Sequence, residues 1–419
     1  MNEAATDPPA PAALSDRALL ALLACVTALG PISTNLYIPV LPEIRDYFQA
    51  SVAQVQATFS ISLVTFALGM LFWGPVSDRY GRRSAVLAGL VVFVIGALTS
   101  LCAPSLGWLV VGRGVQAFGT ATGIVVSRAI VSDRYPFERM AHALAQLTMV
   151  VILGNALAPV VGGYLASLMG WRAIFGVLLG TVGFVAYLVW KRMPETRSSQ
   201  GPPPRPREML AAATTLLRMP LFVACVVQSG VVYATFLVFI SLTPYVMVSA
   251  LGRSPTEFGM YYVLIALGYF FGSWSVGRWM TSREQHWMIK RGIVLQLAGA
   301  ATALILFAVG LGHPLTLFVP LAVLTYGQGL SLPNVTATSV SLVPEQAGVA
   351  SSVLGFLQQV IGAVSVQWMG IFPTNTALPM LIFCTAVCAA GMVALRLLPR
   401  FEDTRRHRRA PASSAVEPR

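Results

Sequence analysis

The stretch that decides the fold is Gly74-Pro-Val-Ser-Asp-Arg-Tyr-Gly-Arg-Arg83, a short polar turn between two apolar runs, 54–75 and 84–103. Each run has about the 20 residues that a helix needs to cross the hydrocarbon core of a bilayer. The turn holds one acid and three arginines, whereas neither run contains a charged residue. Gly81 allows the backbone to turn tightly. The stretch therefore predicts two membrane-spanning helices joined by a charged turn outside the bilayer.

Apolar runs of similar length recur along the 419-residue chain, which is 56% hydrophobic and only 11% charged. Soluble domains carry about 25% charged residues, so this composition excludes an ordinary soluble protein. We expect an all-α integral membrane protein with twelve transmembrane helices in two pseudo-symmetric six-helix bundles. The predicted spans are 18–38, 54–75, 84–103, 107–130, 140–166, 172–190, 220–248, 256–279, 289–310, 314–337, 346–370 and 374–396.

The longest polar interruption divides these spans six and six. It contains Gly-Pro-Pro-Pro-Arg-Pro-Arg at 201–207, which is typical of an extended linker. The expected segments are a cytoplasmic tail 1–17, a first half 18–190, a cytoplasmic Pro-rich linker 191–218, a second half 219–396 and a basic cytoplasmic tail 397–419.

The net charge of +12 indicates topology rather than nucleic-acid binding. Cytoplasmic loops of membrane proteins are enriched in Lys and Arg. With both termini in the cytoplasm, only Arg45, Arg172 and Arg253 of the 28 Lys and Arg residues face outside, and Arg113 lies within a span. A miscounted span would destroy this asymmetry. We therefore expect a multi-pass protein of the bacterial inner membrane.

Two spans contain unusual polar or small residues. Gly112-Arg-Gly-Val-Gln116 places an arginine inside the span 107–130, where a charge is costly and indicates function. The alternative is that Arg113 extends to the outer membrane surface. The segment 154–163 contains Gly154, Pro159, Gly162 and Gly163. These residues favour close helix packing and a kink, and ordinary packing is the alternative explanation.

The turn at 74–83 resembles the signature loop of the major facilitator superfamily, which implies that it acts as a conformational latch. The residues concerned are Gly74, Asp78, Arg79, Gly81, Arg82 and Arg83. The segment around Arg113 resembles the second motif of the family, whose arginine is linked to proton coupling and substrate. Residues 154–163 resemble its antiporter motif, with Ala158 in place of one glycine.

Three further stretches, 34–42, 242–246 and 332–358, look like the bicyclomycin/chloramphenicol resistance branch of drug:proton antiporters. That branch usually has an aspartate in the first span, and this chain has Asn35 there. None of the sixteen acids lies in the middle of a predicted span. Proton antiport is therefore implied by the resemblance alone, with Asp78 or Asp133 as an alternative proton carrier, or transport is uncoupled.

Polar and aromatic residues within the spans are the candidates for a substrate cavity near the membrane midplane. For all of them except Arg113, ordinary packing or hydrogen bonding between helices is an equally good explanation. The candidates are Asn35, Tyr37, Arg113, Gln116, Gln228, Tyr233, Phe236, Asn334, Phe356 and Gln359.

The function expected from the resemblance is export of small amphiphilic drugs. An arginine without an acidic partner favours neutral or anionic substrates, such as phenicols, over cationic drugs. The alternatives are uncoupled or inward transport of a small metabolite, and a non-transporting receptor or membrane enzyme. No metal motif, P-loop or catalytic constellation is present in the sequence. We expect no cofactor, no metal, no nucleic-acid partner and a monomer driven by the proton gradient.

Overall fold

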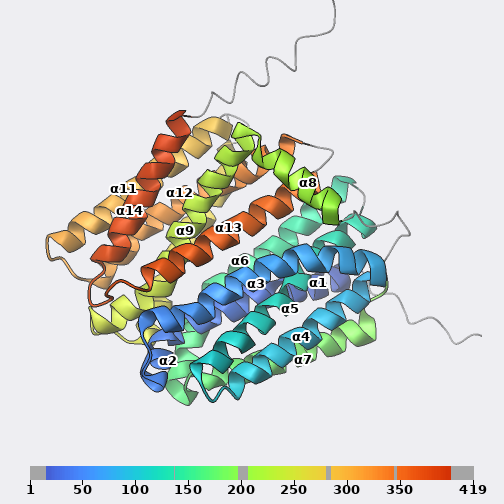
Figure 1. Ribbon diagram of the computed structural model, residues 1–419, viewed down its shortest axis with the longest axis horizontal. Helices are drawn as coiled ribbons and strands as arrows, with labels where there is room; N and C mark the ends of the chain where they lie inside the picture. The colour runs from blue at the N-terminus through green and yellow to red at the C-terminus, as the bar shows by residue number, and fades with distance from the viewer. Residues whose placement is uncertain (1–15, 136, 197–205, 280–284, 344–346, 398–419) are drawn as a thin grey trace, which may run out of the picture. The chain divides into compact units, whose positions relative to one another are not determined.

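The computed structural model describes residues 16–135, 137–196, 206–279, 285–343 and 347–397. The described residues form helices and no β-strand (Figure 1). Twelve of these helices are long and apolar enough to cross a membrane. The predicted all-helical fold with twelve spans is therefore confirmed. The tails predicted at 1–17 and 397–419 lie almost wholly outside the described residues.

The chain divides into two compact units, Met1–Pro204 with Pro255–Met260, and Arg205–Ser254 with Tyr261–Arg419. The helices before the division are α1 (Asp16–Tyr37), α2 (Leu41–Phe48), α3 (Val52–Tyr80), α4 (Arg82–Leu101), α5 (Leu106–Arg134), α6 (Phe137–Met169) and α7 (Arg172–Arg192). Those after it are α8 (Pro206–Leu217), α9 (Pro220–Ser249), α10 (Pro255–Trp279), α11 (Gln285–Ala308), α12 (Pro314–Ser341), α13 (Ala347–Met369) and α14 (Leu378–Leu397).

The same helix pairings occur in both units. In the first, α4 packs on α5 and α7, and α1 packs on α5 and α6. In the second, α11 packs on α12 and α14, and α9 packs on α12 and α13. Each unit thus repeats one arrangement of six spanning helices, in which α4 corresponds to α11 and α5 to α12.

Glycines bring these corresponding helices into backbone contact. A Cβ atom on Gly96 of α4 would lie 2.2 Å from the Gln116 nitrogen and 2.6 Å from the Gly112 oxygen of α5. A Cβ atom on Gly299 of α11 would lie 2.7 Å from the Leu324 nitrogen and 2.4 Å from the Pro320 oxygen of α12. No side chain fits at such distances, so the helices can approach this closely only because these residues are glycines.

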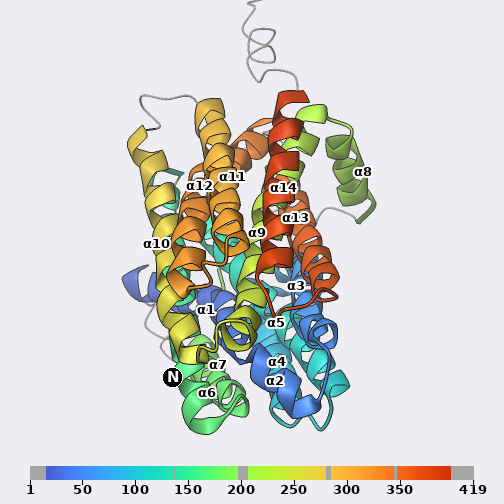
Figure 2. The same cartoon turned by 90° about the vertical axis from the view of Figure 1, so that its left-hand side faces the viewer.

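Two elements were not expected from the sequence. After α1, the chain forms a 3-10 turn (Ile38–Val40) and the short helix α2 instead of an irregular loop. Within the predicted linker lies α8, which contacts α9 and α13 of the second unit (Figure 2). Its Leu216 is buried with Phe222 and Ala350. The Pro-rich stretch suggested extended chain, but Pro206 can begin a helix and the alanines and leucines after it favour one.

Candidate functional site

Arg113 lies in the interior of α5, and only 1% of the residue is exposed. Its Nη1 atom donates a hydrogen bond to Oε1 of Gln116, one turn further along, at 2.7 Å. Among the described residues, Nε and Nη2 of Arg113 and Nε2 of Gln116 have no hydrogen-bond partner. The burial rules out the alternative that this arginine extends to the membrane surface. It also leaves strong donors unsatisfied, which is costly unless a ligand uses them.

The two unsatisfied nitrogens of Arg113 share one edge of the guanidinium group. Their N–H bonds point in nearly the same direction, so together they can hold both oxygens of a planar acceptor. The opposite corner, Nη1, is already bound to Gln116. The site can therefore bind a group with two acceptor oxygens while Gln116 holds the arginine in place.

Tyr37 of α1 forms one wall of this site. The guanidinium of Arg113 lies over the Tyr37 ring, 4.3 Å from its centroid, which is a stabilising cation–π contact. The Tyr37 hydroxyl lies 2.7 Å from Oγ1 of Thr58 on α3. Because Thr58 donates its own hydrogen to the Val55 oxygen, Tyr37 is the donor in this pair. Three helices thus hold Tyr37 and Arg113 against each other.

Asn35 occupies the position where the related branch has an acid. Its Nδ2 atom donates to the Pro31 oxygen at 2.9 Å and to Oδ1 of Asn155 on α6 at 3.1 Å. An amide carries no titratable proton, so this position joins α1 to α6 by a neutral hydrogen bond. The sequence analysis did not select Asn155, although it is a polar residue within the glycine-rich segment 154–163.

The second unit does not repeat the arginine site. The paired backbone contacts at Gly96 and Gly299 align Gly112 with Pro320 and Gln116 with Leu324. Arg113 therefore corresponds to Leu321, and both leucines are buried. The same fold accommodates ordinary apolar packing at these two positions. The charge in the first unit is thus not a requirement of the architecture.

The six candidates in the second unit are divided between two environments. Gln228 of α9 donates to the Gly391 oxygen of α14 at 2.8 Å, and Asn334 of α12 donates to the Leu330 oxygen at 2.9 Å. Both are buried. The bond of Gln228 joins α9 to α14, whereas the bond of Asn334 lies within α12. The other four are half-buried on α9 and α13. They are Tyr233, Phe236, Phe356 and Gln359.

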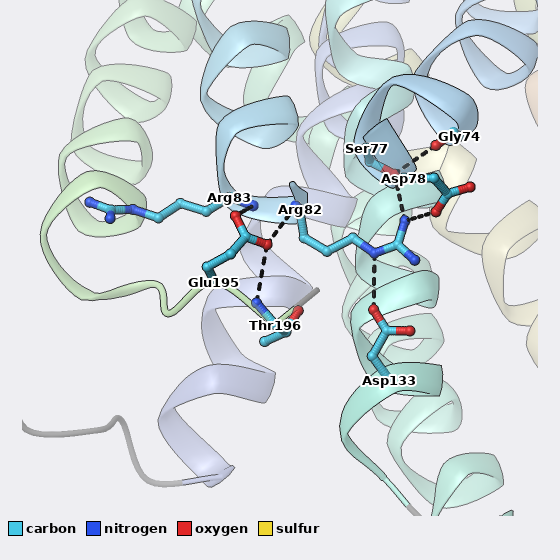
Figure 3. A network of polar contacts seen from close by, with 8 residues as sticks. All are labelled: Gly74, Ser77, Asp78, Arg82, Arg83, Asp133, Glu195 and Thr196. Atoms are coloured by element: carbon cyan, nitrogen blue, oxygen red, sulfur yellow. Dashed lines mark hydrogen bonds and ion pairs between the residues drawn. The ribbon is translucent and has the colours of Figure 1, made fainter. Parts of the chain in front are cut away.

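The polar stretch 74–83 was predicted as a turn, but it is helical except at Gly81, and it forms a network centred on Arg82 (Figure 3). The Arg82 guanidinium binds Asp78 at 2.5 Å and Asp133, at the end of α5, at 3.0 Å. It also donates to the hydroxyl of Ser77, which in turn donates to the Gly74 oxygen. Arg79 lies over the ring of Tyr80 instead. The sequence-predicted residues Asp78, Arg82 and Asp133 are thus brought together.

Glu195, which the sequence analysis did not select, completes this network. Its carboxylate accepts hydrogen bonds from the backbone nitrogens of Arg82 at 2.7 Å and Arg83 at 3.2 Å. These N–H groups belong to the first turn of α4 and have no partner within the helix, and a negative charge is stabilising at this end of a helix. The Arg83 side chain donates to the Trp190 oxygen of α7. The contact spans more than a hundred residues of sequence, so no local pattern indicates it.

The glycine-rich segment of α6 lies against α1. Gly154 faces Ile32, and a Cβ atom on Gly162 would lie 2.2 Å from the Leu36 oxygen. Pro159 lies between these two glycines in α6 and Gly163 follows Gly162, and both residues are buried. The close packing proposed for this segment is therefore present, and it holds the helix that carries Asn35 and Tyr37.

Two similar six-helix units that enclose a charged side chain among apolar spans are typical of secondary transporters. The sequence profile of the Major Facilitator Superfamily matches residues 23–366. The chain therefore belongs to the Major Facilitator Superfamily, which confirms the resemblance seen in the turn at 74–83. With bacterial relatives of the same family, the twelve apolar helices identify a multi-pass inner-membrane protein that acts on small molecules.

Comparison with individual proteins agrees with this assignment. The chain is 28% identical to Multidrug resistance protein D of Escherichia coli (strain K12), over 85% of this chain and 89% of the other. It is 26% identical to the Chloramphenicol resistance protein of Pseudomonas aeruginosa, over 93% and 92%. A solved bacterial homolog of the human lysosomal transporter Spinster has the same fold, with a TM-score of 0.71, 19% identity and coverage of 90% and 92%. The predicted resistance branch is confirmed.

Proposed function

We propose that this protein exports small amphiphilic drugs that are neutral or anionic, such as phenicols, by alternating access. The observation that carries the proposal is the enclosed Arg113, whose Nε and Nη2 atoms lack a partner among the described residues. A nitro or carboxylate group offers two coplanar oxygens to these two donors. A cationic drug would instead meet an arginine that no acid of the described spans neutralises.

The residues proposed to contact substrate follow from these positions. In the first unit they are Arg113, Gln116, Tyr37 and Asn35. In the second unit we propose Tyr233, Phe236, Phe356 and Gln359, because their half-exposed aromatic and amide groups can contact an amphiphile. Gln228 and Asn334 contribute mainly through their hydrogen bonds within the unit.

The proton gradient is the proposed source of energy, used by antiport, although the neutral Asn35 occupies the position of the usual proton carrier. Asp78 and Asp133 are the alternative carriers, because both are carboxylates that bind Arg82. Protonation of either would weaken its ion pair with Arg82 and loosen the turn between α3 and α4. The competing proposal is uncoupled transport, which Asn35 favours because it removes a titratable group from the span.

The proposed topology has both termini in the cytoplasm, and the proposed functional state is a monomer. The concentration of Lys and Arg on one side of the spans supports this orientation. Reporter fusions at the two termini would test it, with cytoplasmic activity expected at both ends.

The deciding experiment measures accumulation of a labelled phenicol in energised cells, with and without the protein and with and without a proton uncoupler. Energised export predicts lower accumulation with the protein and a rise when the uncoupler is added. Lower accumulation that the uncoupler does not change would support uncoupled transport. No effect of the protein, at confirmed membrane abundance, would contradict the assignment of phenicols as substrates.

Substrate charge is tested in the same cells with ethidium, a permanent cation. We expect the phenicol to be exported better than ethidium, because of the unneutralised charge on Arg113. The reverse order would contradict the proposed preference for neutral and anionic drugs.

A further inference from the structure

A recess in the second unit plays no part in the proposed transport site. It has a volume of about 240 Å³ and lies where α10 ends at Trp279 and α11 begins at Gln285. Its walls come from α10, α11 and α12, which lie beside one another in Figure 2. The lining includes Trp279, Trp287, Arg291, Leu295, Tyr326 and Leu330. All of these side chains belong to one unit.

Aromatic side chains and a cation form the polar end of this recess. The rings of Trp279 and Trp287 meet edge to face, with centroids 6.1 Å apart. The guanidinium of Arg291 lies over the Trp287 ring at 5.5 Å. Tyr326 of α12 is joined to Ser275 of α10 by a hydrogen bond of 2.9 Å between the two hydroxyl groups. The lining side chains of the recess are thus linked to their neighbours by specific contacts.

The charged residues nearest the recess are basic in the part of the chain that the structure describes. Arg291 is exposed, and among the described residues it has no ion pair or hydrogen bond. Lys290 directly precedes Arg291 in the chain. Arg278 directly precedes Trp279, and its guanidinium lies over the ring of Trp274. The described segment 285–343 contains no Asp or Glu, and Glu257 lies in the first turn of α10, at the opposite end of that helix. No described acid therefore neutralises Arg291, and its exposed guanidinium can contact an external anion.

The rest of the lining is apolar and extends from a buried to an exposed residue. Leu330 is buried, Leu295 is half-buried, and Val294 is 40% exposed. In a membrane-spanning helix such exposed apolar residues contact lipid chains. Tryptophans at the end of a span, next to a basic residue, are typical of the headgroup region. The recess thus presents a cation and aromatic rings to headgroups and an apolar surface to acyl chains.

We propose that this recess binds an anionic phospholipid, with its phosphate against Arg291 and its acyl chains along Val294 and Leu295. Trp279 and Trp287 flank the headgroup and position the arginine. The chemistry favours a phospholipid over a soluble phosphate, because an apolar surface continues directly from the cation. A basic site between transmembrane helices is a recognised arrangement for such lipids.

The test uses the purified full chain in detergent and counts retained lipids by native mass spectrometry. We expect phosphatidylglycerol to bind more tightly than phosphatidylcholine, and Arg291→Gln to weaken phosphatidylglycerol binding about fivefold, the effect of one basic residue at a membrane surface. Arg291→Lys keeps the charge and should retain most of the binding. Arg192→Gln, which removes an exposed arginine at the end of α7, is the matched control and should have no effect.

A second measurement does not depend on the arginine variants. Brominated lipids quench nearby tryptophans, and brominated phosphatidylglycerol should quench the wild-type protein more than brominated phosphatidylcholine does. The Trp279→Phe/Trp287→Phe variant should lose this difference. Equal quenching by both lipids, or equal effects of Arg291→Gln and Arg192→Gln, would overturn the proposal. Displacement of the lipid by equimolar glycerol phosphate would identify a soluble-anion site instead.

Discussion

At the scale of single residues, Arg113 stands where the second unit has Leu321. The two positions have equivalent backbone contacts, at Gly96 and Gly299, but only one carries a charge. Burying an arginine with two unsatisfied nitrogens destabilises the fold, since those N–H groups lose their hydrogen bonds to water. We therefore propose that a bound substrate, rather than stability, accounts for its presence.

Replacing Arg113 with leucine tests this explanation. We expect Arg113→Leu to abolish phenicol export while raising the free energy of unfolding by about 1–4 kcal/mol, as when buried ionic groups are replaced by apolar ones. Arg113→Lys keeps the charge but not the paired N–H groups and should export weakly. Thermal unfolding of the purified variants and accumulation assays provide the two measurements. A variant that is both less stable and transport-competent would contradict a binding role for Arg113.

Asn35 allows a test in the opposite direction, by restoring an acid. Asn35→Asp places a titratable carboxyl group beside Asn155, whose side-chain amide can donate to it. We expect drug export by this variant to become more sensitive to a proton uncoupler than export by the wild type. Asn155→Asp is a control that adds an acid to the neighbouring helix. Equal uncoupler sensitivity of the wild type and Asn35→Asp would show that position 35 does not limit proton coupling.

At the scale of elements, the junction of α3, α4 and α7 depends on Gly81 and Glu195. Gly81 has φ +97°, and a Cβ atom there would lie 2.5 Å from Oε2 of Glu195. Gly81→Ala therefore both strains the backbone and displaces the carboxylate that caps α4. With ψ at 151°, Gly81 lies in a backbone region that is essentially restricted to glycine, so we expect a loss of stability of about 1–3 kcal/mol from the backbone alone, together with impaired export.

Two further variants separate these effects. Glu195→Ala removes the cap without backbone strain and should cost about 1 kcal/mol of stability. Gly180→Ala is the matched control, because nothing lies within 4 Å of its added methyl group. Thermal unfolding measures all three. If Gly81→Ala and Gly180→Ala unfolded at the same temperature, the role assigned to Gly81 would be wrong.

At the scale of the whole molecule, the helix α8 belongs to the second unit, since it packs through Leu216 on Phe222 and Ala350. We expect two co-expressed fragments, divided between Pro204 and Arg205, to reconstitute export. A division between Arg218 and Met219 should fail, because it separates α8 from α9. Accumulation assays on the two fragment pairs measure this. Equal activity of both pairs would show that α8 does not contribute to folding of the second unit.

The features that could be predicted from the sequence are set by local residues, whereas the features that could not be predicted depend on contacts between distant residues. The spans could be predicted because the bilayer thickness sets their length and composition, and the turn at Gly81 because glycine and the charges define it locally. The bond between Asn35 and Asn155 and the cap from Glu195 join residues more than a hundred positions apart. Such contacts depend on the folded packing of helices, which no local pattern contains.

The matching contacts of Gly96 and Gly299 also bear on how the chain combines a stable scaffold with a variable site. In both units a glycine sets the spacing between two helices, whereas the residues that follow on the partner helix differ: Arg113 and Gln116 in one unit, Leu321 and Leu324 in the other. The repeated architecture thus separates two tasks, with the glycines fixing the distance between helices and the neighbouring positions left to carry the chemistry.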